Sequence, residues 1–226
     1  MRIFAIDTSL EACSACVFDT EEDTVIARES IAMARGHAEA LMPLIARVMA
    51  QAELDFAQID RFVTTTGPGS FTGMRVGIAA ARGLGLAAGK PVVGTSTLSA
   101  FAAPFLNADE TLPVVVAIDA RHDHVYLQVL AAGGRTIVTP RVVPIDDAVR
   151  LARGGKPRVI GNAANLLAAN WPTNDPASQI EQCAAPDIEW VARLGASANE
   201  ASSPAKPLYI RAPDAQPHNA ATLARR

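Results

Sequence analysis

Residues 4–8 read Phe-Ala-Ile-Asp-Thr, and residues 116–120 read Val-Ala-Ile-Asp-Ala. Each stretch is an apolar run that ends on an aspartate, a pattern typical of a buried strand followed by a polar turn. The two aspartates, Asp7 and Asp119, stand 112 residues apart, about half of the 226-residue chain. One short match could arise by chance, so the residues that follow each copy decide whether it is a repeat.

The same order of elements follows both stretches. In the first copy we expect strands over residues 13–18 and 24–31, joined by an acidic turn at 21–23. In the second copy we expect strands over 125–130 and 136–143, joined by the glycines at 133–134. The first half then continues with a helix over about 37–51, a strand over 61–66, a helix over about 72–88, an extended segment over 92–94, a helix over 96–103 and a linker over 104–113.

This order predicts an α/β protein with a duplicated domain, in which each of two similar subdomains is a mixed sheet with helices. Two such halves facing each other are the plan of the actin/hexokinase/Hsp70-like ATPase fold. That plan points the strand-ending aspartates of both halves into a central cleft, although a fold by itself does not give a function. We expect an N-terminal subdomain over 1–106, a C-terminal subdomain over 107–211 and a polar tail over 212–226.

Composition narrows the class of protein. Hydrophobic residues make up 50% and charged residues 19%, which argues against a disordered chain. The net charge of −3 and the 5% of aromatic residues argue against a chain that grips nucleic acid by itself. Neither a secretory signal nor a membrane span is predicted, because the longest apolar stretches are too short. Cys13 and Cys16 fall on opposite faces of a predicted strand, so we expect no disulfide or metal between them. From this use of cysteine we expect a reducing, cytoplasmic location, and we expect no membrane partner.

Residues 67–77 read Gly-Pro-Gly-Ser-Phe-Thr-Gly-Met-Arg-Val-Gly and form the most informative local motif. They follow a strand and open a helix, the geometry in which backbone N–H groups can hold an anion. The motif is not a Walker loop, because Met74 and Arg75 stand where a lysine and a hydroxyl residue are needed. A tight turn between a strand and a helix would select the same glycines.

The helix after this motif carries small residues at every fourth position: Gly73, Gly77, Ala81, Gly85 and Gly89. Glycine inside a helix costs about 1 kcal/mol relative to alanine, so close packing must compensate. The spacing fits two alternatives, packing against the chain's own sheet or contact with a second subunit.

Several polar residues are candidates for chemistry. Asp7 and Asp119 could orient a metal-bound water between phosphates, or each could cap the turn that follows it. His37 stands alone before a helix, and the pair His122 and His124 lies at a turn without further ligands. Ser70 lacks the GxSxG context of a hydrolase nucleophile.

Taken together, the motifs resemble the TsaB (YeaZ) family nearly from end to end. The strings that carry the resemblance are Asp7-Thr8-Ser9, His37-Ala38-Glu39, Gly67-Pro68-Gly69-Ser70-Phe71-Thr72-Gly73-Met74-Arg75-Val76-Gly77, Asp119-Ala120-Arg121 and Leu208-Tyr209-Ile210-Arg211. The resemblance implies a non-catalytic subunit in the formation of N6-threonylcarbamoyladenosine in ANN-decoding tRNAs. It also implies binding to the catalytic relative TsaD, with the P-loop ATPase TsaE as a third component and tRNA met only through the complex.

The same resemblance bears on the metal and on the partner surface. TsaD binds its metal through histidines before the first helix and in a pair after the glycine-rich helix. Here only His37 remains, and residues 95–99 read Thr-Ser-Thr-Leu-Ser, so we expect no metal, no cofactor and no catalytic residue. We expect the surface that binds TsaD, and that pairs two copies when TsaD is absent, to comprise Gly73, Gly77, Ala81, Gly85, Leu41 and Ile45.

Two other function classes compete with this interpretation. A stand-alone small kinase of the same superfamily would need a longer chain, a substrate pocket and an adenosine-binding glycine pair, for which Gly161-Asn162 is the single faint candidate. A metalloprotease would need a ligand cluster that the sequence does not offer.

Overall fold

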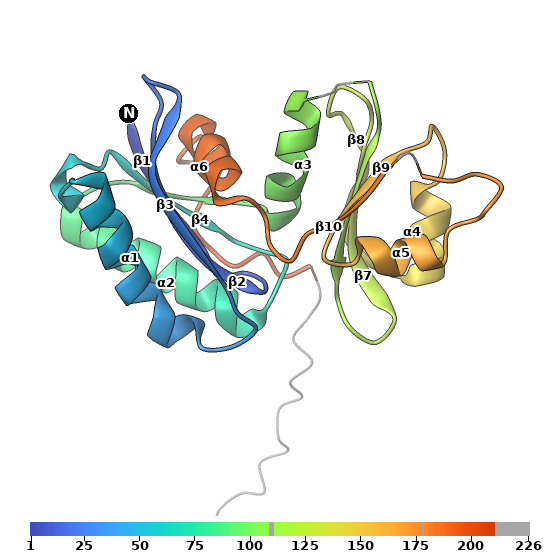
Figure 1. The fold of residues 1–226 in the computed structure, drawn as a ribbon, viewed down its shortest axis with the longest axis horizontal. Helices are drawn as coiled ribbons and strands as arrows, with labels where there is room; N and C mark the ends of the chain where they lie inside the picture. The colour runs from blue at the N-terminus through green and yellow to red at the C-terminus, as the bar shows by residue number, and fades with distance from the viewer. Residues whose placement is uncertain (109–110, 178, 211–226) are drawn as a thin grey trace, which may run out of the picture.

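The computed structural model describes residues 1–108, 111–177 and 179–210, and it has two lobes built on two five-stranded sheets (Figure 1). The first sheet has the spatial order β3-β2-β1-β4-β5, with β1 Arg2–Asp7, β2 Ala12–Asp19, β3 Thr24–Ala32, β4 Arg61–Thr65 and β5 Val92–Thr95. The second has the order β8-β7-β6-β9-β10, with β6 Val114–Asp119, β7 His124–Leu130, β8 Thr136–Pro144, β9 Arg158–Gly161 and β10 Gln179–Gln182. The two orders agree strand for strand, which confirms the duplicated α/β fold.

Strand directions repeat as well. In each sheet the first three strands form an antiparallel meander, and the fourth and fifth strands run parallel to the first. Both sheets are therefore mixed, and Asp7 and Asp119 end the equivalent central strands β1 and β6. Buried strands with near-continuous apolar runs are what a sheet covered on both faces requires.

Helices cover the sheets in pairs. The first lobe carries α1 (His37–Ala52) and α2 (Phe71–Ala88) on one face of its sheet. The short helix η1 (Phe56–Gln58) lies in the connection between α1 and β4. The second lobe carries α4 (Ile145–Ala152) and α5 (Ala164–Ala169). The third helix of the first half is α3 (Thr97–Ala108), and the third helix of the second half is α6 (Ile188–Ser197).

These third helices are exchanged between the lobes. The apolar side of α3 packs on the second sheet, where Leu98 and Phe101 join a buried cluster with Val116. The apolar side of α6 packs on the first sheet, where Val191 joins a cluster with Ile3. Burying a side chain of this size contributes about 1.5–3 kcal/mol, so each lobe is completed by a helix from the other half of the chain.

The helix α3 is longer than the sequence predicted. The expected linker over 104–113 is wrong, because α3 continues to Ala108 with Pro104 inside it. Phe101 and Phe105, one helical turn apart, both pack against the second sheet's cluster, and this burial outweighs the proline. The division expected at 106/107 falls within α3 and stays a prediction as a domain boundary, while the tail over 212–226 lies outside the described residues.

The prediction that Cys13 and Cys16 lie on opposite faces of a strand, β2, is confirmed. Cys13 faces the cluster beneath α1, whereas Cys16 faces the cluster beneath α6. Burial raises the pKa of the Cys13 thiol to about 11 and raises that of Cys16 further, so both thiols are inert at neutral pH. In the part of the chain that the structure describes, no helix has the length and apolar character needed to cross a membrane.

Candidate functional site around the glycine-rich loop

The turn after β1 holds its aspartate in the interior of the first lobe. Asp7 is fully buried, and its Oδ1 accepts hydrogen bonds from the Ser9 amide at 3.1 Å and the Thr65 hydroxyl at 2.5 Å. Among the described residues, Asp7 Oδ2 and the Ser9 hydroxyl have no hydrogen-bond partner. Burial raises the pKa of the Asp7 carboxyl, and the hydrogen bonds from Thr65 and Ser9 oppose that rise. The aspartate therefore caps its own turn, which is the second of the two roles that the sequence left open.

The glycine-rich loop packs directly on this turn, backbone against backbone. The Ser70 amide donates to Ser9 O at 2.7 Å, and the Thr8 hydroxyl donates to Gly73 O at 2.7 Å. A Cβ atom at Gly69 would stand 2.3 Å from Ser9 O, and one at Gly73 would stand 2.1 Å from Thr8 O. The glycines are thus required by the close approach of two backbones.

The start of α2 uses the same residues for capping. Ser70 is the N-cap of α2, and its hydroxyl accepts from the Gly73 amide at 3.2 Å. One of the donors that could hold an anion at this helix end is therefore already satisfied by the chain's own side chain.

The three histidines that the structure describes do not form a ligand set. His37 is buried at the start of α1, and its Nε2 lies 2.9 Å from the Leu10 carbonyl oxygen. Residues 95–99 stand where TsaD is expected to have its histidine pair. In this chain Thr95 and Thr97, two buried residues with hydroxyl groups, occupy that segment. Within the described residues, no group of three or more His, Cys, Asp or Glu side chains is placed to hold a metal ion.

In the second lobe the equivalent aspartate is at the surface. Asp119 Oδ1 accepts from the Arg121 amide at 2.7 Å, and the Asp119 amide donates to Asn162 Oδ1 at 2.8 Å. Its side chain closes the same two-residue turn as Asp7, while remaining exposed. His124 Nδ1 lies 2.6 Å from the carbonyl oxygen of His122, a contact local to the turn.

The structure joins two family strings that are far apart in the chain. Arg75 Nε and Nη2 donate to the Tyr209 hydroxyl at 3.1 and 3.0 Å, and the Arg75 guanidinium stacks 3.7 Å from the Phe71 ring centroid. The Phe71 and Tyr209 rings are 6.0 Å apart, and the Leu208 amide donates to Thr66 O at 2.8 Å. Apart from the presence of both motifs, no feature of the sequence indicates this contact. Arg211, the end of the second motif, lies outside the described residues.

The small-residue ridge on α2 faces inward, and the prediction that it lies on an exposed surface is wrong. A Cβ atom at Gly77 would stand 2.6 Å from Thr8 Oγ1, one at Gly85 would stand 2.2 Å from Val92 Cγ2, and Ala81 is fully buried. Leu41 and Ile45 of α1 are likewise buried in the first lobe's core. The small residues are required because α2 lies unusually close to β1, β4 and β5. Of the two alternatives for this spacing, the structure therefore shows packing against the chain's own sheet.

The opposite sides of α1 and α2 are exposed and carry small and apolar residues. Met42 on α1 is 51% exposed and Leu86 on α2 is 86% exposed. Their uncharged neighbours on these sides are Ala38, Pro43, Ala46, Ala79, Gly83 and Ala87, and their charged neighbours are Glu39, Arg47, Arg75 and Arg82. We call these sides the outer face of α1 and α2. The two helices lie next to each other on the first lobe (Figure 1).

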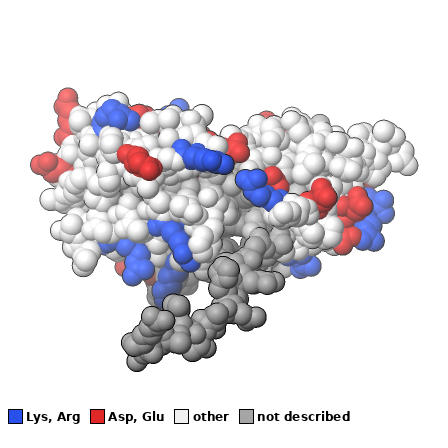
Figure 2. All heavy atoms as spheres, turned by 90° about the horizontal axis from the view of Figure 1, so that it is seen from below, with Lys and Arg blue, Asp and Glu red and all other residues white. Residues whose placement is uncertain are grey.

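The charged side chains on the lower side of the molecule are scattered. Outside the grey atoms, Figure 2 shows small groups of both signs with broad uncharged areas between them. No single-sign stripe of the kind that follows a nucleic-acid backbone crosses the part of this side that is described.

The chain matches a family of tRNA-modifying proteins. Residues 26–187 match the family model described as TsaD, tRNA N6-adenosine threonylcarbamoyltransferase. An uncharacterised protein of Mycobacterium tuberculosis (strain ATCC 25618 / H37Rv) is 34% identical over 219 residues, covering 95% of this chain and 94% of that protein. The tRNA threonylcarbamoyladenosine biosynthesis protein TsaB of Haemophilus influenzae is 39% identical over 126 residues, which cover 56% of this chain and 52% of that one.

Solved structures agree with this match. YeaZ from Pseudomonas aeruginosa superposes with a TM-score of 0.74 at 27% identity, covering 92% of this chain and 99% of that one. A second Pseudomonas aeruginosa structure, described as similar to peptidase YEAZ, superposes with a TM-score of 0.77 at 26% identity, covering 93% and 99%. With two equivalent mixed sheets and exchanged helices, the molecule has the actin-like ATPase fold, and the chain belongs to the TsaB (YeaZ) family.

Proposed function

We propose that this chain is a non-catalytic subunit in the formation of N6-threonylcarbamoyladenosine in tRNA and that it acts in the cytoplasm by binding a TsaD-type catalytic subunit. TsaE would join as the ATP-hydrolysing component, and tRNA would be met through the complex. The relatives named TsaB are described as threonylcarbamoyladenosine biosynthesis proteins, which supports the pathway.

The observation that carries the non-catalytic role is the closed contact between the turn at 7–9 and the glycine-rich loop. To hold phosphate groups at the start of α2, the loop would need free backbone N–H groups and space beside the turn at 7–9. Here two hydrogen bonds of 2.7 Å join them, and even a methyl group on Gly69 or Gly73 would overlap a backbone oxygen. The His37 imidazole is held against Leu10 O and belongs to no group of potential metal ligands among the described residues, which supports the same conclusion.

The outer face of α1 and α2 is the surface we propose for the partner. An exposed apolar face on neighbouring helices gains free energy when a second helix pair covers it. Met42 and Leu86 are the large apolar side chains that a partner would bury there. The same face can pair with its own copy by a two-fold axis, so a homodimer is expected when the TsaD-type subunit is absent.

The experiment is reconstitution with the TsaD-type and TsaE-type proteins of the same organism. The chain alone should neither hydrolyse ATP nor form the modified nucleoside, and adding it to the other two should raise modification of ANN-decoding tRNA. Met42→Glu and Leu86→Glu should each weaken binding to the TsaD-type subunit by about tenfold or more, because a carboxylate would be buried without a partner.

Ile137→Glu is the matched control, because Ile137 on β8 is 54% exposed and lies on the other lobe. It should leave binding and modification unchanged. ATP turnover by the purified chain, or normal binding by folded Met42→Glu and Leu86→Glu variants, would contradict the proposal.

A further inference from the structure

The first sheet has an open edge at β3. Among the strands of the described residues, β3 is the outermost and pairs only with β2. The Met33 amide donates to Glu11 O at 3.0 Å, so Glu11 and Met33 form a hydrogen-bonded pair of the ladder. Hydrogen-bonded and non-hydrogen-bonded pairs alternate, so the next pair, Ala12 and Ala32, is a non-hydrogen-bonded pair. By the alternation of an antiparallel ladder, Arg28, Ser30 and Ala32 direct their N–H and C=O groups away from β2, toward the outside of the sheet.

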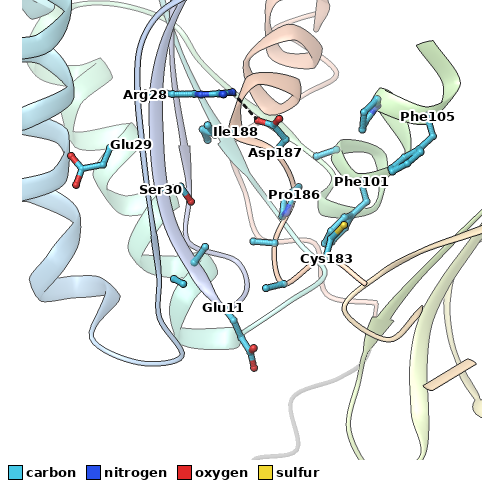
Figure 3. A pocket seen from close by; sticks show the side chains of 16 residues that line it. Glu11, Arg28, Glu29, Ser30, Phe101, Phe105, Cys183, Pro186, Asp187 and Ile188 are labelled. Atoms are coloured by element: carbon cyan, nitrogen blue, oxygen red, sulfur yellow. Dashed lines mark ion pairs between the residues drawn. The ribbon is translucent and has the colours of Figure 1, made fainter. Parts of the chain in front are cut away.

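This edge borders two hollows. A cavity of about 770 Å³ is lined by Arg28, Ser30 and Ala32 of the edge, by Phe101 of α3 and by the segment 183–188. A second hollow, of about 390 Å³, is lined by residues 23–28 and Glu189. Figure 3 shows Arg28 and Ser30 pointing toward the larger cavity, with Phe101 on its far side. The groove formed by both hollows, which we call the β3 groove, therefore follows the strand along its length.

The duplicated fold offers an internal comparison. β8 occupies the equivalent edge of the second sheet and contains Pro140 and Pro144. Proline lacks the N–H that an added strand would need, and it is a common protection of sheet edges. β3 contains no proline, so its edge keeps the donors and acceptors that an added strand would use.

The charge around the β3 groove is acidic. Its carboxylates are Glu11, Asp23, Glu29, Asp187 and Glu189, and Arg28 is the guanidinium among its lining residues. Arg28 pairs with Asp187 and Glu189, Arg47 pairs with Glu29, and Arg193 pairs with Asp23 and Glu189. With Arg47 and Arg193 included, carboxylates still outnumber guanidinium groups, which selects against an acidic occupant.

We propose that the β3 groove binds an extended, basic segment of a partner protein, which adds to β3 as a further strand of the first sheet. Backbone hydrogen bonds to Arg28, Ser30 and Ala32 give the binding its direction. Every second side chain of the added strand would point into the larger cavity, and at these positions small apolar groups would lie beside Phe101 and basic groups would meet Glu11 and Asp187. The groove is lined by residues of β3, α3 and the segment 183–188 and by none of α1 or α2, so this proposal does not depend on the proposed function.

The test uses the full chain, isotopically labelled, titrated with a capped peptide whose cavity-facing positions alternate between valine and arginine, with threonine at the intervening positions. Binding should shift the amide signals of Arg28, Ser30 and Ala32 and slow their exchange with solvent by about tenfold or more at saturation. The counterpart with glutamate in place of arginine should bind about tenfold more weakly or worse.

Ser30→Pro removes an outward N–H without removing a hydrogen bond to β2, and it should weaken binding about tenfold or more. Ser30→Ala, which keeps the N–H, should bind as the unaltered chain does. If Ser30→Pro does not fold, Glu11→Lys replaces it, and it should weaken the arginine peptide while strengthening the glutamate peptide.

The proposal is overturned if the arginine peptide fails to bind, if it binds without protecting the three edge amides, or if folded Ser30→Pro binds normally. Deletion of residues 212–226 tests the chain's own C-terminal residues as the occupant. Binding that is seen only after this deletion would assign the groove to those residues and would also overturn the proposal.

Discussion

Asp7 carries a carboxyl group that is fully buried, yet the described residues satisfy only one of its two oxygens. The sequence predicted that this residue ends a strand, because the apolar run stops there. It could not predict the burial, which depends on Thr65, 58 residues away, and on the glycine-rich loop that closes over the turn. The two readings of Asp7 and Asp119 therefore stayed open until the contacts of each carboxylate were known.

Replacing Asp7 by asparagine should stabilise the protein at high pH. Burial raises the pKa of Asp7, so the folded state favours the protonated carboxyl, and its contribution is lost as pH rises above the ordinary value of 3.8. Asparagine is uncharged throughout and keeps an oxygen for Ser9 and Thr65. Thermal unfolding should show a higher melting temperature for Asp7→Asn at pH 8, by about 2–4 °C for each kcal/mol gained, and a difference that shrinks toward pH 4.

Asp119→Asn is the control for this experiment, because Asp119 closes an equivalent turn while exposed to solvent. Its effect on the melting temperature should change little with pH. A gain for Asp7→Asn that is equal at pH 4 and pH 8 would show that desolvation of the charge is not the cause.

At the scale of one element, α2 shows how far periodicity can lead. The four-residue spacing of Gly73, Gly77, Ala81 and Gly85 predicted correctly that one side of the helix makes a close approach. It could not say what is approached, because a sheet and a second helix select the same small residues. The length of α3 was missed for a related reason, since Pro104 signals an end while the tertiary contacts of Phe105 continue the helix.

Alanine substitutions on the two sides of α2 should have opposite effects. Gly73→Ala places a methyl group 2.1 Å from Thr8 O, a backbone atom that cannot rotate away, and should destabilise the fold by about 1–3 kcal/mol or more. Gly83→Ala meets nothing within 4 Å and should stabilise it by up to about 1 kcal/mol. Denaturant unfolding of both variants measures the difference, and similar effects from the two would refute the close contact with the turn at 7–9.

At the scale of the whole molecule, the exchange of α3 and α6 joins the two lobes, because each helix packs on the sheet of the other half. The repeat predicted two similar halves, and the equivalent strand orders confirm it. The repeat could not reveal the exchange of α3 and α6. The hydrophobic pattern of each helix predicts an apolar side, but it does not say which of the two sheets that side packs on. The contacts that decide the placement are long-range, and Arg61 on β4 is among them. Arg61 Nη1 donates to the carbonyl oxygens of Gly195, Ala196 and Ala198, each at 3.0 Å.

Arg61→Met should therefore loosen the first lobe through a helix that belongs to the second half of the chain. The substitution keeps the length of the side chain but leaves three carbonyl groups at the end of α6 without their charged donor, at a cost of about 2–4 kcal/mol. Hydrogen exchange should rise together in α6 and in β1 and β4, the strands that α6 covers. Arg47→Met is the control, since its guanidinium pairs with Glu29 at the surface and should matter far less. Faster exchange confined to α6, with β1 and β4 unchanged, would mean that the exchanged helix is not part of the first lobe's cooperative core.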